Sequence, residues 1–160
     1  MKKNYSLYRR ILLSNQWQSD AQNIPTKQQA WLMCQSSLTE KLQQICHHFD
    51  VELLHQGWQK YDDQNGQFWL REVLLKGDNI PWIYAQTIVP EETIKNVAQE
   101  LLNLGEKPLG LWLFPQNPNR INLDWLKDPQ TALFARRSTL TINGYPLEIR
   151  ELFLNSFKFS

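Results

Sequence analysis

The chain is poor in the residue types that mark several large protein classes. It has two cysteines and six glycines in 160 residues, and its hydrophobic runs fall far short of the roughly 20 residues that cross a bilayer. Two cysteines are too few for the set of disulfides that stabilises many small secreted proteins. Few glycines leave little material for phosphate-binding loops, and the sequence has no Gly-x-Ser-x-Gly nucleophile motif. These absences disfavour secreted scaffolds, membrane-spanning proteins, nucleotide-binding enzymes and serine hydrolases.

An excess of one charge is also lacking. The 17 Lys and Arg residues nearly balance 16 Asp and Glu residues, the net charge is +1, and both signs are scattered along the chain. The densest basic clusters are only Arg9-Arg10 and Arg136-Arg137. Because binding to nucleic acid depends on a clustered basic surface, we expect no nucleic-acid partner.

The N-terminus lacks a hydrophobic export segment. The basic start Met1-Lys2-Lys3 resembles the beginning of a signal peptide, but the nearest apolar run is only Ile11-Leu12-Leu13. We therefore expect a cytoplasmic protein without a membrane span.

Metal-binding motifs are absent as well. Cys34 and the run Cys46-His47-His48 contain suitable ligand types, but their spacing fits no zinc pattern. Adjacent histidines on a helix point in different directions, which separates them further. We predict no metal site.

Apolar and aromatic residues, in contrast, are abundant. The chain is 42% hydrophobic and 12% aromatic, with seven tryptophans. A chain of this length buries roughly 70% of its unfolded surface, which suffices for one core. We expect a single domain over residues 1–160, and a monomer.

The spacing of apolar residues divides the chain near residue 50. Before that point, the spacing over 26–48 predicts two short helices separated near Ser36-Ser37, with Ser37 capping the second helix and Glu40 completing a capping box. After it, the period changes to two, as in β-strands. The predicted strands are residues 51–58, 68–75, 81–89, 109–114, 138–142 and 145–154.

Turn residues indicate how these strands are connected. Residues 76–79 predict a hairpin between the second and third strands, and Asn143-Gly144 predicts a type I′ hairpin between the last two. Neighbouring strands are therefore expected to be antiparallel.

The remaining segments provide helices and one long connection. The spacing over 94–104 predicts one apolar helical face. The acidic Glu91 stands at the start of this helix, and Gly105 stands where its C-terminal cap belongs. Residues 115–136 carry three prolines and a short apolar patch, which we interpret as a partly helical excursion able to act as a lid. The predicted fold class is α+β, a single six-stranded antiparallel sheet with helices on one side.

Two charged residues, Arg71 and Glu151, fall on apolar faces of predicted strands. Their apolar neighbours on those faces are Trp69, Val73 and Leu75, and Tyr145, Leu147, Ile149 and Phe153. A charge buried among such residues costs several kcal/mol unless it is paired. On the opposite face of the last strand, Glu148 and Arg150 form an ordinary solvated pair.

Two explanations fit these buried charges. Arg71 and Glu151 either pair with each other or reach water at the sheet edge. Alternatively, they line a pocket in which Arg71 holds an anion through two hydrogen bonds and Glu151 contacts a hydroxyl group. The pattern alone does not decide between them.

Four sequence blocks resemble the chorismate pyruvate-lyase family in order and spacing, over about residues 30 to 155. The blocks are residues 69–75; 81–82 with 87–90; 104–105 with 108–110 and 113–114; and 136–138 with 151–154. The resemblance implies a six-stranded antiparallel sheet with helices on one side and a ligand site closed beneath helical flaps.

The family's site residues match four positions of this chain. An Arg on the second strand and a Glu on the last strand correspond to Arg71 and Glu151, which are implied to be catalytic and substrate-binding. A Leu in the Pro-Leu-Gly block corresponds to Leu109. The family has a Met in its first flap where this chain has Leu38, a departure that matters little if the ligand contacts the main-chain N–H there.

The resemblance further implies a reaction. Pyruvate is eliminated from chorismate to leave 4-hydroxybenzoate, the entry step of ubiquinone biosynthesis, without a cofactor and with slow product release. Arg71 would bind the ring carboxylate and Glu151 the ring hydroxyl. Glu151 would donate a proton as the ether bond breaks, or a hydrogen would move within the bound substrate, and the residues are compatible with both routes.

A binding module is the alternative function. The implied fold is similar to effector-sensing domains of some transcription regulators, so the chain would bind an aromatic carboxylate without turnover. The presence of both Arg71 and Glu151 favours the enzyme.

Overall fold

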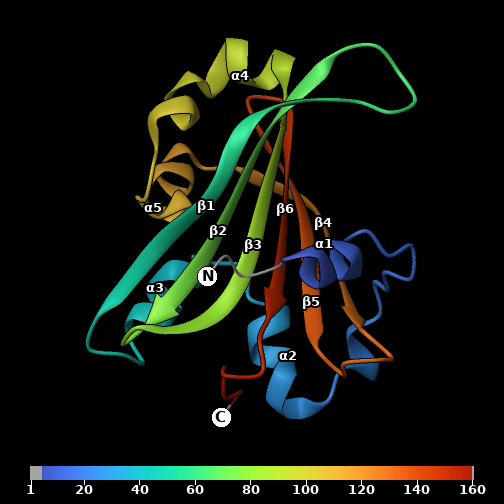
Figure 1. Ribbon diagram of the computed structural model, residues 1–160, viewed down its shortest axis with the longest axis vertical. Coiled ribbons are helices and arrows are strands. Elements are labelled where there is room, and N and C mark those ends of the chain that lie inside the picture. The colour runs from blue at the N-terminus through green and yellow to red at the C-terminus, as the bar shows by residue number, and fades with distance from the viewer. Residues whose placement is uncertain (1–4, 160) are drawn as a thin grey trace.

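The computed structural model describes residues 5–159, and its centre is one antiparallel sheet with the strand order β1-β2-β3-β6-β5-β4 (Figure 1). The strands are β1 Phe49–Lys60, β2 Gln67–Gly77, β3 Ile80–Pro90, β4 Asn119–Lys127, β5 Phe134–Ile142 and β6 Tyr145–Phe153. The predicted α+β class and single six-stranded antiparallel sheet are confirmed. The start Met1-Lys2-Lys3, considered above for export, lies outside the described residues.

Both predicted hairpins are present. Asp78 and Asn79 have φ values of 50° and 68° between β2 and β3, and Asn143 and Gly144 have φ values of 51° and 85° between β5 and β6. Two consecutive positive φ angles define a type I′ turn, whose twist matches that of the flanking strands.

Four α-helices and two 3₁₀ helices cover the face of the sheet that carries Arg71 and Glu151. They are α2 Thr26–Leu32, α3 Leu38–Gln43, α4 Glu91–Val97, η2 Gln99–Asn103, α5 Leu109–Leu113 and η3 Phe114–Gln116. The predicted break and cap are confirmed, since the Ser37 hydroxyl accepts a hydrogen bond from the Glu40 N–H at 3.3 Å. The predicted helix over 94–104 is divided into α4 and η2 and ends at Gly105 with φ of +61°.

These helices bury two apolar clusters against the sheet. One joins α2 and α3 to the lower ends of the central strands in Figure 1. The other joins α4, η2 and α5 to their opposite ends. The space between the two clusters is where the candidate site lies.

The other face of the sheet also carries a helix, α1 Ser6–Leu12, which was not expected. Ile11 and Leu12 of α1 pack in a third apolar cluster with Leu74 and Tyr84 from the central strands. Helices therefore lie on both faces of the sheet, and not on one side only. The face under α1 is apolar as well, and packing of the helix removes its apolar side chains from water. A short 3₁₀ helix, η1 Ala21–Asn23, follows α1 along the chain.

A buried carboxylate anchors α1. The Glu72 side chain accepts hydrogen bonds from Arg9 at 2.9 and 3.0 Å and from Gln86 at 3.0 Å, and it also accepts one from the Tyr84 hydroxyl. Burial alone would raise the pKa of Glu72, but these hydrogen bonds outweigh it and the pKa is lowered.

The prediction of a strand over residues 109–114 is wrong. Those residues form α5 and the start of η3, which bury Leu113 while Leu111 stays exposed. A short apolar run such as Leu-Gly-Leu-Trp-Leu-Phe fits a strand and a buried helical turn equally well, so its periodicity could not decide.

The sixth strand instead lies inside residues 115–136, so the interpretation of that segment as an excursion or lid is wrong, although its first two residues are helical, in η3. Its longest element is β4, which pairs with β5 from Asn119 to Lys127 as an edge strand. Its Asn, Asp and Lys residues have low strand propensity, and a register shift between Arg120 and Asn122 interrupts its alternation.

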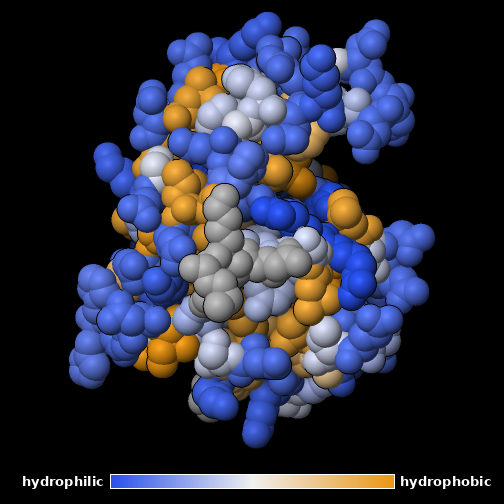
Figure 2. All heavy atoms as spheres, in the orientation of Figure 1, coloured by the Kyte–Doolittle hydropathy of each residue, from blue (hydrophilic) through white to orange (hydrophobic). Residues whose placement is uncertain are grey.

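The visible surface is mainly hydrophilic, with apolar residues in scattered patches (Figure 2). The most exposed large apolar residues are far apart in the chain: Leu13 follows α1, Ile121 is in β4 and Leu111 is in α5. Across residues 5–159, none of the helices has both the length and the apolar character of a membrane span.

Candidate functional site

Arg71 is buried on the inner face of β2 without a carboxylate partner in the part of the chain that the structure describes. Only 2% of its surface is exposed, and its Nη2 donates to the carbonyls of Gly105 at 2.9 Å and Lys107 at 2.8 Å. Its Nε is buried with no hydrogen-bond partner among the described residues. Burial lowers the pKa of Arg71 to about 10. A guanidinium held in this way has donors available for an anion.

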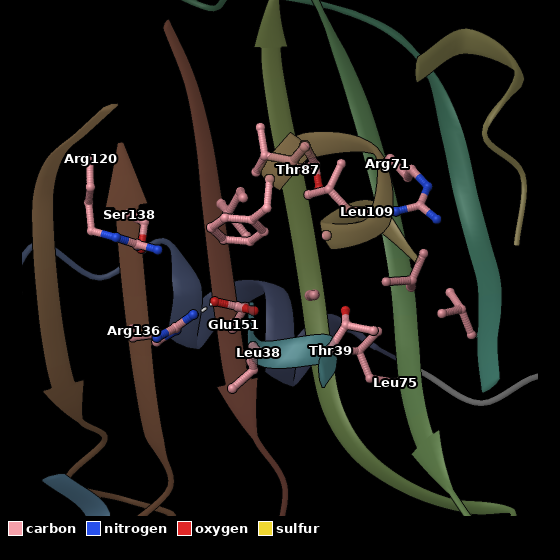
Figure 3. Close-up of a pocket in the computed structure, with 17 residues that line it drawn as sticks. Leu38, Thr39, Arg71, Leu75, Thr87, Leu109, Arg120, Arg136, Ser138 and Glu151 are labelled. Atoms are coloured by element: carbon pink, nitrogen blue, oxygen red, sulfur yellow. Dashed lines mark hydrogen bonds and ion pairs between the residues drawn. The ribbon is translucent and has the colours of Figure 1, made fainter. Parts of the chain in front are cut away.

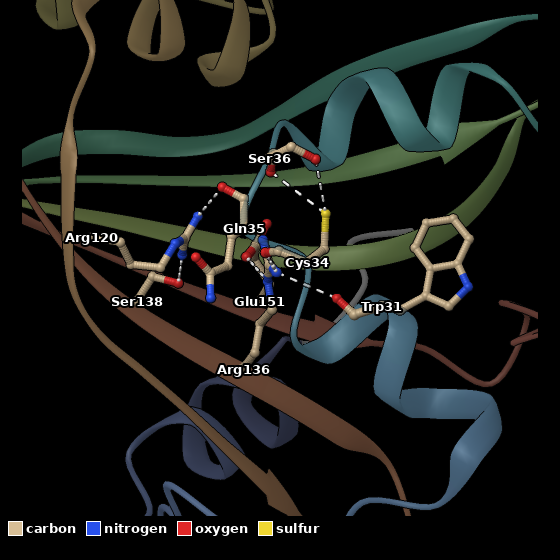
Figure 4. Close-up of polar contacts among 8 residues, drawn as sticks. All are labelled: Trp31, Cys34, Gln35, Ser36, Arg120, Arg136, Ser138 and Glu151. Atoms are coloured by element: carbon tan, nitrogen blue, oxygen red, sulfur yellow. Dashed lines mark hydrogen bonds and ion pairs between the residues drawn. The ribbon is translucent and has the colours of Figure 1, made fainter. Parts of the chain in front are cut away.

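Glu151 is held on β6 by a different arginine. Its Oε1 accepts a hydrogen bond from Nε of Arg136 at 2.7 Å, and 7% of Glu151 and 3% of Arg136 are exposed. Arg136 also donates to the carbonyls of Trp31 at 3.3 Å and Cys34 at 2.6 Å (Figure 4). The interpretation that Arg71 and Glu151 pair with each other is therefore wrong.

One pocket brings the four predicted site residues together (Figure 3). The apolar lining is Leu38, Val51, Val73, Leu75, Ala85, Leu109, Gly110, Leu113, Phe114 and Ile149. The polar lining is Thr39, Arg71, Thr87, Arg120, Arg136, Ser138 and Glu151. A largely apolar cavity with a few convergent polar groups suits a small aromatic anion.

Leu38 and Leu109 begin the two helices that cover the pocket, α3 and α5. The first N–H groups of a helix have no partner within it, so these two ends carry donors. The helices approach closely at Gly110, where an added Cβ would lie 2.9 Å from the Ser37 hydroxyl. The cover over the pocket is thus formed by α3 and α5.

Sequence reasoning missed the pocket residues Arg120, Arg136 and Ser138. Arg136 and Ser138 alternate on the inner face of β5, and that alternation is the sequence signal that identifies them as pocket residues. Arg120 was missed because β4 was not recognised as a strand.

Over residues 5–159, His, Cys, Asp and Glu side chains form no group of three or more that could hold a metal ion. Cys34 and Cys46 are free thiols. The predicted pair on the outer face of β6 is present, with Nε of Arg150 2.8 Å from Oε2 of Glu148, but it is partly buried and not solvated.

A solved structure of a GntR-family transcriptional regulator from Bacillus cereus aligns with a TM-score of 0.49 and 13% sequence identity, over 70% of this chain and 96% of that chain.

The sequence comparisons are more specific. The chorismate lyase family model matches residues 11–160. A chorismate pyruvate-lyase of Pectobacterium carotovorum is 37% identical over 78% of this chain and 75% of its own length. Chorismate pyruvate-lyases of Hamiltonella defensa and Photorhabdus laumondii are 32% and 35% identical, over 86% and 87% of this chain and 84% and 88% of their own lengths. This chain belongs to the chorismate lyase family.

Proposed function

We propose that this protein is a chorismate pyruvate-lyase, a carbon–oxygen lyase that converts chorismate into 4-hydroxybenzoate and pyruvate. The observation that carries the proposal is one largely apolar pocket with Arg71, which has no carboxylate partner among the described residues, at one side and Glu151 at the other. Their strands, β2 and β6, are separated only by β3, so the backbones lie about 10 Å apart. A six-membered ring with polar groups at opposite ends spans such a gap with one hydrogen bond at each end.

In this proposal, Arg71 binds the ring carboxylate of chorismate. Its unpartnered Nε provides a donor, and the first N–H groups of α3 and α5, at Leu38 and Leu109, complete the hydrogen bonds. A main-chain contact at Leu38 makes the departure from the family's Met unimportant for binding.

Glu151 accepts a hydrogen bond from the ring hydroxyl. Because its Oε1 already accepts from Arg136 at 2.7 Å, the carboxylate is arranged as an acceptor and not as a proton donor. This supports hydrogen transfer within the substrate. The hydrogen on the carbon that bears the hydroxyl moves to the methylene carbon of the enolpyruvyl group while the ether C–O bond breaks, so the ring becomes aromatic and pyruvate leaves as the ketone.

The driving force of this elimination is aromatisation, so the reaction requires no cofactor. The apolar walls exclude water and strengthen both polar contacts. The same walls and the α3 and α5 cover hold the flat product, which leads to slow release and product inhibition. We place the enzyme in the cytoplasm as a single-domain monomer without a nucleic-acid partner, at the entry of ubiquinone biosynthesis.

The test is to mix purified protein with chorismate and to follow 4-hydroxybenzoate and pyruvate. We expect equimolar products from the wild type, loss of turnover in Arg71→Ala and reduced turnover in Glu151→Ala. Glu148→Ala is the matched control, because it removes a carboxylate from the same strand on the other face and should keep wild-type turnover. A wild type that binds chorismate or 4-hydroxybenzoate without turnover would identify a sensing module instead.

A further inference from the structure

A second arginine of the pocket, Arg120 on β4, also lacks a carboxylate partner within residues 5–159. It donates from Nη1 to the Ser138 hydroxyl and from Nη2 to the carbonyl of Gln35 at 3.3 Å (Figure 4). Its Nε is buried and, among the described residues, has no hydrogen-bond partner. Arg120 is thus oriented by neutral acceptors and keeps a free donor.

The charges that line the pocket do not balance. They are three arginines and one carboxylate, and the Arg136–Glu151 ion pair neutralises one arginine. Burial and then the nearby charge of Arg136 lower the pKa of Arg120. Two anionic groups on one ligand would compensate Arg71 and Arg120.

The order of the polar side chains along the sheet indicates where each anionic group would lie. Arg71 is on β2, Glu151 on β6 and Arg120 on the edge strand β4, so the carboxylate lies between the two arginines (Figure 3). In chorismate, the ring carboxylate and the hydroxyl are at opposite ends of the ring, and the enolpyruvyl ether is on the carbon next to the hydroxyl. Its second carboxylate therefore extends beyond the hydroxyl, on the side of Arg120.

We propose that Arg120, oriented by Ser138, binds the carboxylate of the enolpyruvyl arm and thereby distinguishes the dianionic substrate from the monoanionic aromatic product. This inference rests on the proposed function. Arg71 contacts a carboxylate that both substrate and product carry, whereas Arg120 contacts one that departs with pyruvate.

Two aromatic ligands test this division directly by calorimetry. One is 4-hydroxybenzoate, and the other is 3-carboxymethoxy-4-hydroxybenzoate, which adds a second carboxylate where the enolpyruvyl arm is attached. In Arg120→Met, we expect affinity for the dicarboxylate to fall about 10- to 100-fold, the usual worth of a hydrogen bond to a charged group, while affinity for 4-hydroxybenzoate changes less than about threefold. The KM for chorismate should rise in parallel. Arg120→Lys, which keeps the charge without the planar fork, should lie between.

Arg137→Met is the matched control. Like Arg120→Met, it removes one arginine, but Arg137 lies on the outer face of the sheet, where it pairs with Asp124 at 2.9 Å. The affinities for both ligands should therefore stay at wild-type values. Retained binding of 4-hydroxybenzoate shows that an Arg120 variant is folded at the site. Equal losses for both ligands in Arg120→Met, or wild-type affinity for the dicarboxylate, would overturn the role of Arg120. A wild type that never turns over chorismate would instead contradict the proposed function.

Discussion

Arg136 and Glu151 are direct register partners on β5 and β6, and Nε of Arg136 lies 2.7 Å from Oε1 of Glu151 in a site from which water is largely excluded. A buried ion pair of this kind adds little stability in itself, but removal of one partner leaves a buried charge unpaired. The pair fixes the carboxylate that is proposed to meet the ring hydroxyl.

Removal of Arg136 alone should destabilise the fold. In Arg136→Met, we expect the free energy of unfolding to fall by about 3 to 5 kcal/mol, measured by urea denaturation. The double variant Arg136→Met/Glu151→Leu should recover most of this loss, because no unpaired charge remains. A double variant as unstable as Arg136→Met would mean that the carbonyl contacts of Arg136, and not its ion pair, stabilise the fold.

Stability should depend on the protonation of Glu72 in acid. Because the pKa of Glu72 is lowered in the folded protein, its contribution is complete above the ordinary value of 4.5 and is lost as the pH falls through the folded value. Between about pH 6 and about pH 3, the free energy of unfolding should therefore fall less in Glu72→Gln than in the wild type. Parallel pH profiles for the two proteins would show that the carboxylate does not carry this dependence.

The close contact between the two covering helices should control product release. In Gly110→Ala, the new Cβ would lie 2.9 Å from the Ser37 hydroxyl and 3.3 Å from the Thr39 hydroxyl, so α3 and α5 must separate. We expect 4-hydroxybenzoate to dissociate several-fold faster in stopped-flow fluorescence. Gly57→Ala is the control, since its nearest neighbour, Nε2 of His55, is 4.0 Å away. An unchanged dissociation rate in Gly110→Ala would exclude separation of these helices as the release step.

Deuterium-labelled chorismate can show whether the hydrogen moves within the substrate or through the protein. Chorismate with deuterium on the carbon that bears the hydroxyl should yield pyruvate with deuterium in its methyl group, because Glu151 is arranged as an acceptor. Lactate dehydrogenase reduces the pyruvate at once, which prevents exchange with solvent before mass spectrometry. A methyl group that carries only solvent hydrogen would assign the proton transfer to a protein side chain or water.

Local patterns in the sequence were sufficient for much of the fold. Period-two alternation placed most of β2, β3 and β6, and the positive-φ turns at Asp78-Asn79 and Asn143-Gly144 set their pairing. The same alternation identified Arg71 and Glu151 as charges on inner faces, because the side-chain direction of a strand residue follows from its position alone. These features depend on neighbours a few residues apart.

The partners of those charges were decided only by the tertiary structure. Whether Glu151 pairs with Arg71 or Arg136 depends on which strand lies next to β6, and Arg120 enters the pocket only because a polar edge strand, β4, pairs with β5. Leu38 and Leu109 were placed at the site by the family resemblance, and the packing of α3 on α5 brings them together there. Such contacts join residues far apart in the chain, as in the hydrogen bond from Arg136 to the Cys34 carbonyl across 102 positions, and a single sequence carries no periodic signal for them.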